Sequence, residues 1–212
     1  MYQYFKIVLD FLSSVFILII LLPVLLGISI GILISMGKPI IFKQERIGKN
    51  NKTFLMYKFR TMREPKKGQN RLLSDSDRIT KLGDFLRRSS LDELPEIINV
   101  IKGDMSLVGP RPLLDFHLEL FDKYQQKRHS VKPGMTGLAQ IMGRQSLSFK
   151  QRIILDLEYV NKMSFLFDIK IIMKTIFVVL GSSGVKNGQK FEEVDDVGLK
   201  ELIEKRYKQA ND

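Results

Sequence analysis

Residues 11–37 form a run of 27 positions without a charged side chain. A straight helix of that length extends about 40 Å, which exceeds the roughly 30 Å hydrocarbon core of a bilayer. A cleaved signal peptide has a shorter apolar core, and a buried core helix of this length and uniform hydrophobicity would be exceptional. The run therefore predicts insertion into a membrane.

Pro23 lies near the middle of this run. Its ring removes a backbone donor and disfavours the preceding turn, so a kink or a break is expected there. A spanning helix tolerates such a kink when neighbouring groups satisfy the freed carbonyl, and the residues alone favour a spanning helix. The alternative is a helix that bends at Pro23, dips into one leaflet and returns to the same side.

Most of the positive charge of the chain follows directly after the apolar run. Residues 38–72 contain eleven Lys and Arg against two Glu, a local net charge of +9, compared with +11 for all 212 residues. The positive-inside rule places this side in the cytoplasm, and the segment is expected to contact anionic lipid headgroups. A nucleic-acid partner is not expected, because no recognition helix, zinc finger or RNA-binding aromatic signature accompanies the charge.

The content of cysteine and histidine excludes several classes of protein. The chain has no Cys, and its two His are His117 and His129. A disulfide scaffold, a Cys-based zinc site and a Cys nucleophile are therefore excluded, as is a metal site built from many His. The length suits one domain with an appended membrane element.

Hydrophobic patterning predicts an α+β fold that is predominantly helical. The segments IIFKQERIG and KTFLMYKFRTM are typical of strands, and the Gly/Asn-rich turn GKNNK between them favours a short β-hairpin. Helices are predicted at 78–88, 95–102, 113–128, 147–162 and 165–181, with a loop at 65–77. The resulting division is a membrane helix at 1–37, a cytoplasmic domain at 38–185 and a polar C-terminal tail at 186–212.

The helix predicted at 165–181 is heavily apolar but carries Asp168, Lys170 and Lys174. It is too short and too charged to span a membrane comfortably. Two interpretations remain open for it. It lies as an amphipathic helix in the membrane interface, or it forms part of the core of the domain.

Residues 87–112 hold the densest set of chemically interesting side chains, centred on the adjacent carboxylates Asp92 and Glu93. The simplest reading is helix initiation, because acidic side chains are stabilised at a helix N-terminus. A capping box from Ser90 to Glu93 would place Pro95 inside the first turn, where its ring disfavours a helix. A helix that starts at Leu94–Pro95 avoids this conflict and leaves the two carboxylates just outside its N-terminal end.

The residue types in this segment suit the chemistry of phosphate groups. A carboxylate attacks phosphorus only when the charge of the phosphate is screened, and Mg²⁺ and arginine side chains provide such screening. Arginine adds a bidentate geometry that lysine lacks. The segment therefore holds the parts for phosphoryl transfer through a carboxylate nucleophile. A GxxxxGK[ST] loop is missing, so an ATPase or kinase of the P-loop class is not supported.

Three blocks in the chain resemble the signature blocks of the bacterial sugar transferases, and more narrowly of the small monotopic phosphoglycosyl transferases. These blocks are KFRTM (58–62), RRSSLDELPEIINVIKGDMSLVGPRPL (87–113) and RHSVKPGMTGLAQIMGR (128–144). The resemblance implies transfer of a sugar-1-phosphate from a UDP-sugar to polyprenol (undecaprenyl) phosphate, with release of UMP. It also implies a ping-pong mechanism through a phosphosugar-aspartyl intermediate.

The resemblance implies a role for individual residues. Asp92 falls on the position of the nucleophile, with a Mg²⁺ cofactor at the same carboxylate, and Glu93 assists through the metal or by positioning the second substrate. Arg87 and Arg111 occupy positions suited to binding phosphate. Weaker candidates from the other two blocks are Lys58, Arg60 and Arg144.

The resemblance also changes the expectation for the membrane helix. The family has a re-entrant helix that breaks at a Ser-Pro pair and keeps both of its ends on the cytoplasmic face of the bacterial inner membrane. In this chain the pair is Leu22-Pro23, so the hydroxyl that supports the break is absent. Pro23 is nevertheless expected to mark the break, because the active site has to meet a cytoplasmic nucleotide sugar and a lipid phosphate at headgroup level.

A non-catalytic, membrane-anchored protein that binds anionic lipid is the alternative. It accounts for residues 11–72 but not for the ordered blocks from 87 to 144. The role of His129 stays open between a hydrogen bond in a turn and a part in catalysis, and His117 is expected to be structural. The identity of the sugar cannot be deduced, because one or two hydrogen bonds can decide it.

Overall fold

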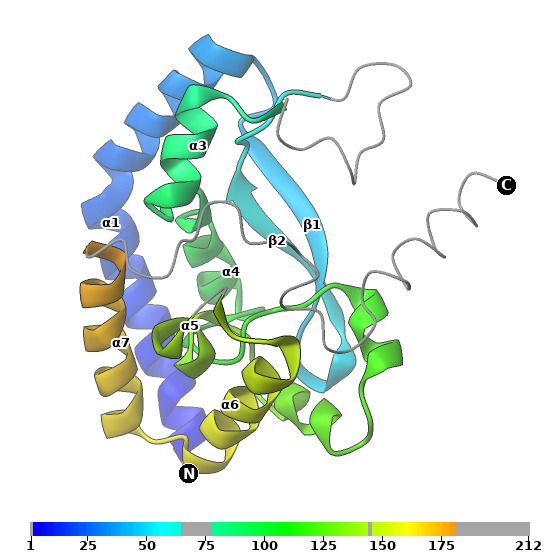
Figure 1. The fold of residues 1–212 in the computed structure, drawn as a ribbon. Helices are drawn as coiled ribbons and strands as arrows, with labels where there is room; N and C mark the ends of the chain where they lie inside the picture. The colour runs from blue at the N-terminus through cyan, green and yellow to red at the C-terminus, as the bar shows by residue number, and fades with distance from the viewer. Residues whose placement is uncertain (1, 65–77, 144–145, 181–212) are drawn as a thin grey trace, which may run out of the picture.

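The computed structural model describes residues 2–64, 78–143 and 146–180 (Figure 1). The longest helix is α1 (Tyr2–Met36). The remaining α-helices are α3 (Lys81–Arg88), α4 (Glu96–Lys102), α5 (Leu138–Met142), α6 (Phe149–Lys162) and α7 (Phe165–Leu180). The strands are β1 (Ile41–Ile47), β2 (Thr53–Phe59), β3 (Ser106–Val108) and β4 (Gly134–Thr136). The 3₁₀ turns are η1 (Lys49–Asn51), η2 (Leu91–Glu93), η3 (Asp115–Leu120) and η4 (Gln125–Ser130).

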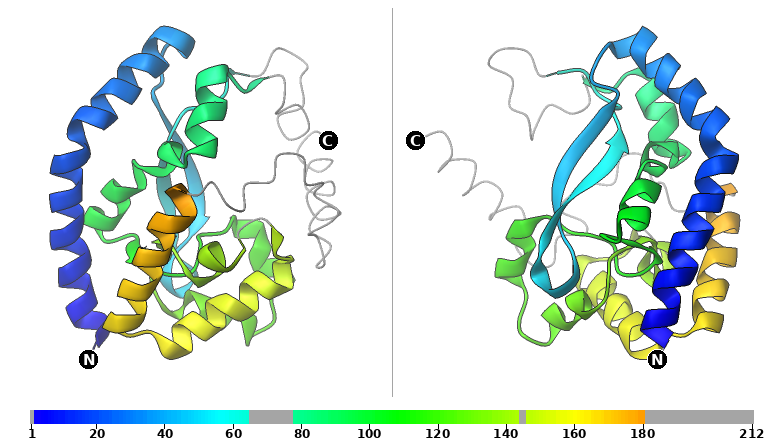
Figure 2. Two further views of the ribbon diagram at one scale, coloured as in Figure 1. Left: turned by 60° about the vertical axis from the view of Figure 1, so that its left-hand side comes forward. Right: turned by 180° about the vertical axis from the view of Figure 1, so that it is seen from behind.

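Helix α1 is long and apolar enough to cross a membrane, and most of its large apolar side chains are exposed. It continues through Pro23 as one helix and bends along its length (Figure 2). The expected break at Pro23 is therefore absent, because the helix is continuous there. Proline removes a single backbone hydrogen bond, and a helix can accommodate that loss by kinking instead of ending.

Helix α1 is held to the rest of the protein near both of its ends. Near the start, Lys6 Nζ lies 2.5 Å from an oxygen of Asp168, and Asp10 accepts a hydrogen bond of 2.6 Å from Ser106 Oγ. Near the end, Ile32 is fully buried in a cluster with Phe59 and Leu86. The domain therefore holds the helix near both ends and leaves most of its middle exposed.

The predicted hairpin is confirmed. Strands β1 and β2 pair antiparallel from Ile41 opposite Phe59 to Ile47 opposite Thr53. The connecting turn contains Asn50 and Asn51 at positive φ, which asparagine tolerates better than most residues. Helix α4 packs between α1 and this hairpin (Figure 1).

Asn99 of α4 joins the helix to the hairpin. Its side chain is completely buried, donates to the carbonyl of Leu55 and accepts from the N–H of Tyr57. The amide thus satisfies two backbone groups of β2, much as a neighbouring strand does. This pairing fixes the strand next to Lys58 against the helix that follows Asp92 and Glu93.

The helix predicted at 113–128 is wrong. The segment forms the two short turns η3 and η4 instead. Asp122 Oδ1 accepts from the N–H of Gln125, so this aspartate starts a new turn instead of continuing the old one. The apolar spacing reflects burial, because Phe121 packs against Phe149 and Ile153 of α6.

The other predicted helices correspond to α3, α4, α6 and α7, whereas α5 and the parallel pair β3–β4 were not predicted. Helix α7 packs on the core with one side, as one of the two interpretations expected, and its place in a membrane interface stays a prediction. Ile171 is buried in the core, while Leu166 and Phe177 are 78% and 69% exposed. The views place α7 on the same side of the molecule as α1 (Figure 2). The loop expected at 65–77 and the tail expected at 186–212 lie outside the described residues.

Candidate active site

Asp92 and Glu93 lie in η2, immediately before α4. Ser90, which precedes η2, has a left-handed backbone conformation with φ of 58°, and this turns the chain sharply between α3 and η2. Pro95 is the N-cap of α4. The prediction that the two carboxylates lie just outside the N-terminal end of this helix is confirmed.

Glu93 is the centre of an ion-pair cluster. One of its oxygens lies 2.6 Å from Lys58 Nζ and 2.5 Å from Arg111 Nη2, and its second oxygen lies 3.4 Å from Arg111 Nη1. Burial alone would favour the protonated acid, but Arg111 and Lys58 hold the pKa of Glu93 well below its usual range. Glu93 is therefore an anion near neutral pH that pairs with two cations and offsets one of their two charges.

Asp92 has a different environment from its neighbour. Its carboxylate accepts no hydrogen bond from the residues that the structure describes. Burial and the adjacent Glu93 raise its pKa, and Lys58, Arg87 and Arg111 act in the opposite direction. The charges of three cations predicted from the sequence thus act on Asp92. The two adjacent carboxylates differ in that Glu93 is fully paired and Asp92 is not.

Glu96 belongs to the same cluster but was not among the predicted site residues. It is 2% exposed, and one of its oxygens lies 3.3 Å from Lys58 Nζ. Burial and the charge of Glu93 raise the pKa of Glu96 to about 7. Lys58 therefore lies between a fixed anion and a carboxyl group that titrates near neutral pH. The only sign of it in the sequence is its position as the first residue of α4, three residues after Glu93.

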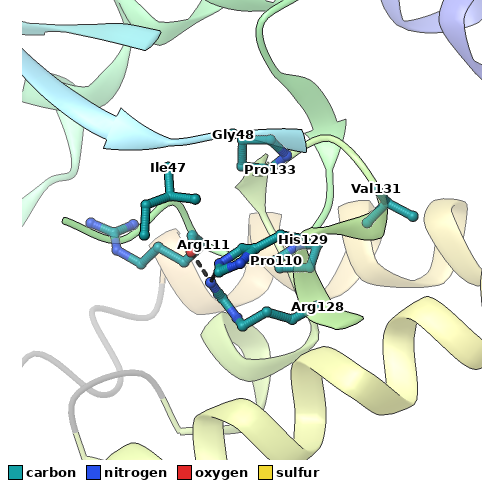
Figure 3. Close-up of a pocket in the computed structure, with 8 residues that line it drawn as sticks. All are labelled: Ile47, Gly48, Pro110, Arg111, Arg128, His129, Val131 and Pro133. Atoms are coloured by element: carbon teal, nitrogen blue, oxygen red, sulfur yellow. Dashed lines mark hydrogen bonds between the residues drawn. The ribbon is translucent and has the colours of Figure 1, made fainter. Parts of the chain in front are cut away.

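Arg111 is held in place through its backbone. The segment that carries it follows β3, and its backbone contacts β4 through hydrogen bonds between Gly109 and Thr136 and between Gly134 and Pro110. The carbonyl of Arg111 itself accepts 2.7 Å from Nη2 of Arg128 (Figure 3). The flanking prolines further restrict this backbone. The backbone of Arg111 is therefore held rigidly, and its guanidinium group is positioned against Glu93.

Arg128 itself is buried and paired. It is 2% exposed, and its Nε and Nη2 donate to the same oxygen of Asp156 in α6, at 3.0 and 2.6 Å. Burial raises the pKa of Asp156 even though Arg128 opposes the change. This pair connects α6 to the segment that carries Arg111.

The two histidines have structural surroundings. His129 is buried and accepts a hydrogen bond from Arg128 through Nε2, and burial and Arg128 together lower its pKa to about 3. His117 stacks between Phe116 and Phe149, and burial lowers its pKa to about 4. Both rings are therefore neutral near pH 7. For His129 this geometry favours the structural alternative over a part in catalysis.

Arg60 makes contacts with the protein backbone. Its Nε donates to the carbonyl of Met62, and its Nη1 donates to the carbonyl of Lys38. These bonds tie the end of β2 to the chain that follows α1, so its phosphate-binding role stays a prediction without support from its contacts. Arg87 donates to Thr61 Oγ1 through Nε. Arg144 lies outside the described residues.

The surroundings of Asp92 fit a magnesium ion. Mg²⁺ is usually held by one or two carboxylates together with phosphate oxygens of the substrate and water. Asp92 offers an oxygen donor that no described residue occupies, whereas Glu93 is already paired. Within the described residues no cluster of three or more acidic, His or Cys ligands exists. A site with one protein carboxylate that is completed by the substrate is therefore the arrangement that fits.

A narrow crevice lies beside Arg111, on the side where β1 ends (Figure 3). It brings together the end of the hairpin, the segment around Arg111 and the chain between η4 and β4. Its lining residues are Ile47, Gly48, Pro110, Arg111, Arg128, His129, Val131 and Pro133.

Comparison with known proteins identifies the family. The family described as "Bacterial sugar transferase" matches residues 1–182. The chain is 44% identical over 177 residues to the uncharacterized sugar transferase EpsL of Bacillus subtilis, covering 84% of this chain and 88% of that protein. It is 42% identical over 179 residues to the UDP-glucose:undecaprenyl-phosphate glucose-1-phosphate transferase of Escherichia coli, covering 79% of this chain and 38% of that longer protein. The chain belongs to the bacterial sugar transferase family.

Proposed function

We propose that the protein transfers a sugar-1-phosphate from a UDP-sugar to polyprenol (undecaprenyl) phosphate, giving polyprenyl-diphosphate-sugar and UMP as the first membrane step of glycan assembly. Two relatives support the substrate classes by name, the glucose-1-phosphate transferase of Escherichia coli and the UDP-galactose-lipid carrier transferase of Erwinia amylovora. The observation that carries the proposal is the carboxylate of Asp92, which has no hydrogen-bond partner among the described residues, lies next to the pairing of Glu93 with Lys58 and Arg111, and feels the charge of Arg87 as well.

Asp92 acts as the nucleophile in this proposal. An oxygen of its carboxylate attacks the phosphorus that carries the sugar, a bond forms between them, and the bond from that phosphorus to the bridging oxygen breaks. The electron pair leaves with UMP. An oxygen of polyprenol phosphate then attacks the same phosphorus, and Asp92 leaves as a free carboxylate. The two half-reactions constitute a ping-pong mechanism.

The neighbouring residues divide the remaining work. Lys58, Arg87 and Arg111 screen the charge of the donor phosphates, so that the anionic Asp92 can approach. Glu93 keeps Lys58 and Arg111 oriented at the site. A Mg²⁺ ion held by Asp92 and the diphosphate would supply further charge neutralisation.

The way in which α1 is held supports a re-entrant topology at the cytoplasmic face of the bacterial inner membrane. One domain contacts α1 near its start through Lys6 and Asp10 and near its end through Ile32. A helix that spans the bilayer would carry one of these contact regions to the opposite face. The apolar surfaces of α1 and α7 lie on the same side of the molecule and face the lipid in this arrangement.

This topology predicts the location of both ends of the chain. Tags attached at residue 1 and at residue 212 should both be accessible from the cytoplasm and protected from the outside. The measurement is labelling or protease digestion of tags in intact cells and in opened cells. An N-terminal tag that is accessible from outside would require a spanning helix and contradict the proposal.

Anionic lipid headgroups remain proposed partners of residues 38–72. Within this segment Lys58 is engaged with Glu93 and Arg60 with backbone carbonyls. The exposed Lys43 and Lys52 of the hairpin region keep the charge that such lipids attract. The alternative of a purely lipid-binding protein accounts for this surface but assigns no task to the cluster around Asp92.

The proposed reaction is tested by UMP release from a panel of UDP-sugars, with detergent-solubilised protein. Repeated UMP release is expected from one donor only when polyprenol phosphate is present, because the second half-reaction regenerates the enzyme; without the acceptor, release should stop at no more than one UMP per enzyme. It should stop when EDTA removes divalent cations and return when Mg²⁺ is added in excess. A well-folded protein that binds polyprenol phosphate but releases no UMP from any donor would favour the lipid-binding alternative.

A further inference from the structure

Arg46 of β1 lies on the face of the hairpin that covers the site. Residues directly opposite each other in an antiparallel pair share a face, and the face alternates along each strand. Arg46 is opposite Phe54, and two pairs further along this face Phe42 is opposite Lys58. Met56, between them on the same face, is buried against α4. Arg46 and Lys58 therefore point to the same side of the sheet, toward the helix that follows Asp92.

Arg46 has no ionic partner in the described part of the chain. Its Nη2 donates to the neutral amide of Gln44 at 2.6 Å, and its Nε is buried without a hydrogen-bond partner. By comparison, Arg111 and Arg128 are each paired with a carboxylate. A guanidinium group taken partly out of water normally acquires an anionic partner, because its desolvation is costly otherwise. Arg46 is thus a cation that lacks its anion.

The surroundings of Arg46 add further positive charge. Burial and the nearby Arg111 lower its pKa to about 10, while Glu96 and Glu93 act in the opposite direction. Arg46 remains charged at neutral pH despite this repulsion. The next residue, Ile47, donates its N–H to the carbonyl of Leu113 at 2.8 Å, which ties this end of β1 to the segment that carries Arg111. Ile47 and Arg111 also line the same crevice (Figure 3).

We propose that Arg46 binds the phosphate of the UDP-sugar that leaves with the uridine. This inference rests on the proposed function and extends it to a residue that neither the sequence motifs nor the pairing around Glu93 assigned. The transferred phosphate has to lie at Asp92, next to Lys58 and Arg111. The leaving phosphate is bonded to it, and Arg46 approaches from the same face of the hairpin, nearer the turn. A cation at that place stabilises the negative charge that develops on the leaving UMP.

Binding of UMP to the full-length, detergent-solubilised protein tests this assignment without requiring turnover. Calorimetry should give a dissociation constant for UMP that rises about 10- to 100-fold in Arg46→Gln, the range for loss of a charged hydrogen bond. Arg46→Lys should lie between wild type and Arg46→Gln, since lysine keeps the charge but not the fork. Arg88→Gln is the matched control, because it makes the same substitution at an exposed arginine of α3 that pairs with Asp84.

Three further measurements separate the outcomes. Uridine binding and kcat/KM for polyprenol phosphate should not change in either Arg46 variant, and the thermal unfolding of Arg46→Lys should match wild type. An unchanged affinity for UMP in Arg46→Gln overturns the assignment, as does an effect confined to polyprenol phosphate. Wild-type protein that binds UMP but shows no transfer would refute the proposed function and leave Arg46 as a nucleotide-phosphate ligand. Turnover with unaltered UMP binding in Arg46→Gln would refute Arg46 alone.

Discussion

Asp92→Asn is expected to reduce UMP release by about 10³-fold or more, since an amide oxygen cannot form the proposed intermediate at a useful rate. The fold should be retained. Burial and Glu93 disfavour the ionised form of Asp92, so removal of this charge relieves a cost and does not add one. The thermal unfolding midpoint of the variant should therefore equal or exceed that of wild type.

The same prediction has a covalent readout. With UDP-sugar and Mg²⁺ but no polyprenol phosphate, mass spectrometry should find one sugar-phosphate on the peptide that contains Asp92 of wild type. Asp84→Asn is a suitable control, because Asp84 is a partly exposed acid of α3 that pairs with Arg88. It should retain near-normal turnover. An unmodified Asp92 peptide under conditions of turnover, or an active Asp92→Asn, would rule out the covalent route.

The pH dependence of turnover follows from the environment of Asp92. A protonated carboxyl group does not attack phosphorus, so the rate should fall as the pH decreases through the pKa of Asp92. Because burial and Glu93 raise that pKa in the protein itself, the acidic limb at limiting Mg²⁺ should lie above the ordinary range of aspartate. Added Mg²⁺ should move the limb to lower pH, since a cation at the carboxylate favours its ionised form. The profile of Asp84→Asn should show the same limb.

Arg128→Met is expected to destabilise the folded protein by about 3–5 kcal/mol, the usual cost of leaving one partner of a buried ion pair without the other. Asp156 would stay buried without its cation, and the carbonyl of Arg111 would lose its donor. Denaturant unfolding in detergent measures the change. The control is the exposed pair of Lys162 and Glu158, which lies on the same helix as Asp156. Lys162→Met should lower the free energy of unfolding by less than about 1 kcal/mol.

A double variant distinguishes a lost ion pair from lost packing. Arg128→Met combined with Asp156→Leu removes both charges and keeps the volume apolar, so much of the stability should return. The rate of transfer should nevertheless stay below wild type, because Arg111 has lost the contact that fixes its backbone. A double variant that is less stable than Arg128→Met would show that the charges were not the cause.

The hairpin and most of the helices could be predicted, because they depend on residues that are close together in the sequence. The turn GKNNK specifies the hairpin, and Pro95 specifies where α4 begins. The position of Asp92 and Glu93 just before this helix could therefore be predicted from the sequence. The pairing of β3 with β4 brings together residues 106–108 and 134–136. No local sequence pattern predicts a contact between segments so far apart. The helix predicted at 113–128 was wrong for a different reason. Its apolar spacing was real, but burial against α6 and the cap at Asp122 decided its conformation.

The same distinction applies to the site. Residues inside the recognisable blocks, such as Arg111 and Lys58, were predicted and do meet at Glu93. Arg46 and Glu96 were missed, because their significance depends on what they face across the hairpin and α4. A lone arginine in a strand is normally a solvated side chain. Only the register of β1 with β2 shows that Arg46 shares a face with Lys58.

The pairing of Glu93 with Lys58 and Arg111 also has a consequence for selectivity. Glu93 is contacted by Lys58 Nζ and by two nitrogens of Arg111, whereas the two side chains carry three and five N–H donors. Donors therefore remain for a phosphate, while the carboxylate offsets one of the two positive charges. In the proposed function, the attraction for any small anion is then weaker than two unpaired cations would exert. Binding depends more on whether a ligand fits the donors that remain.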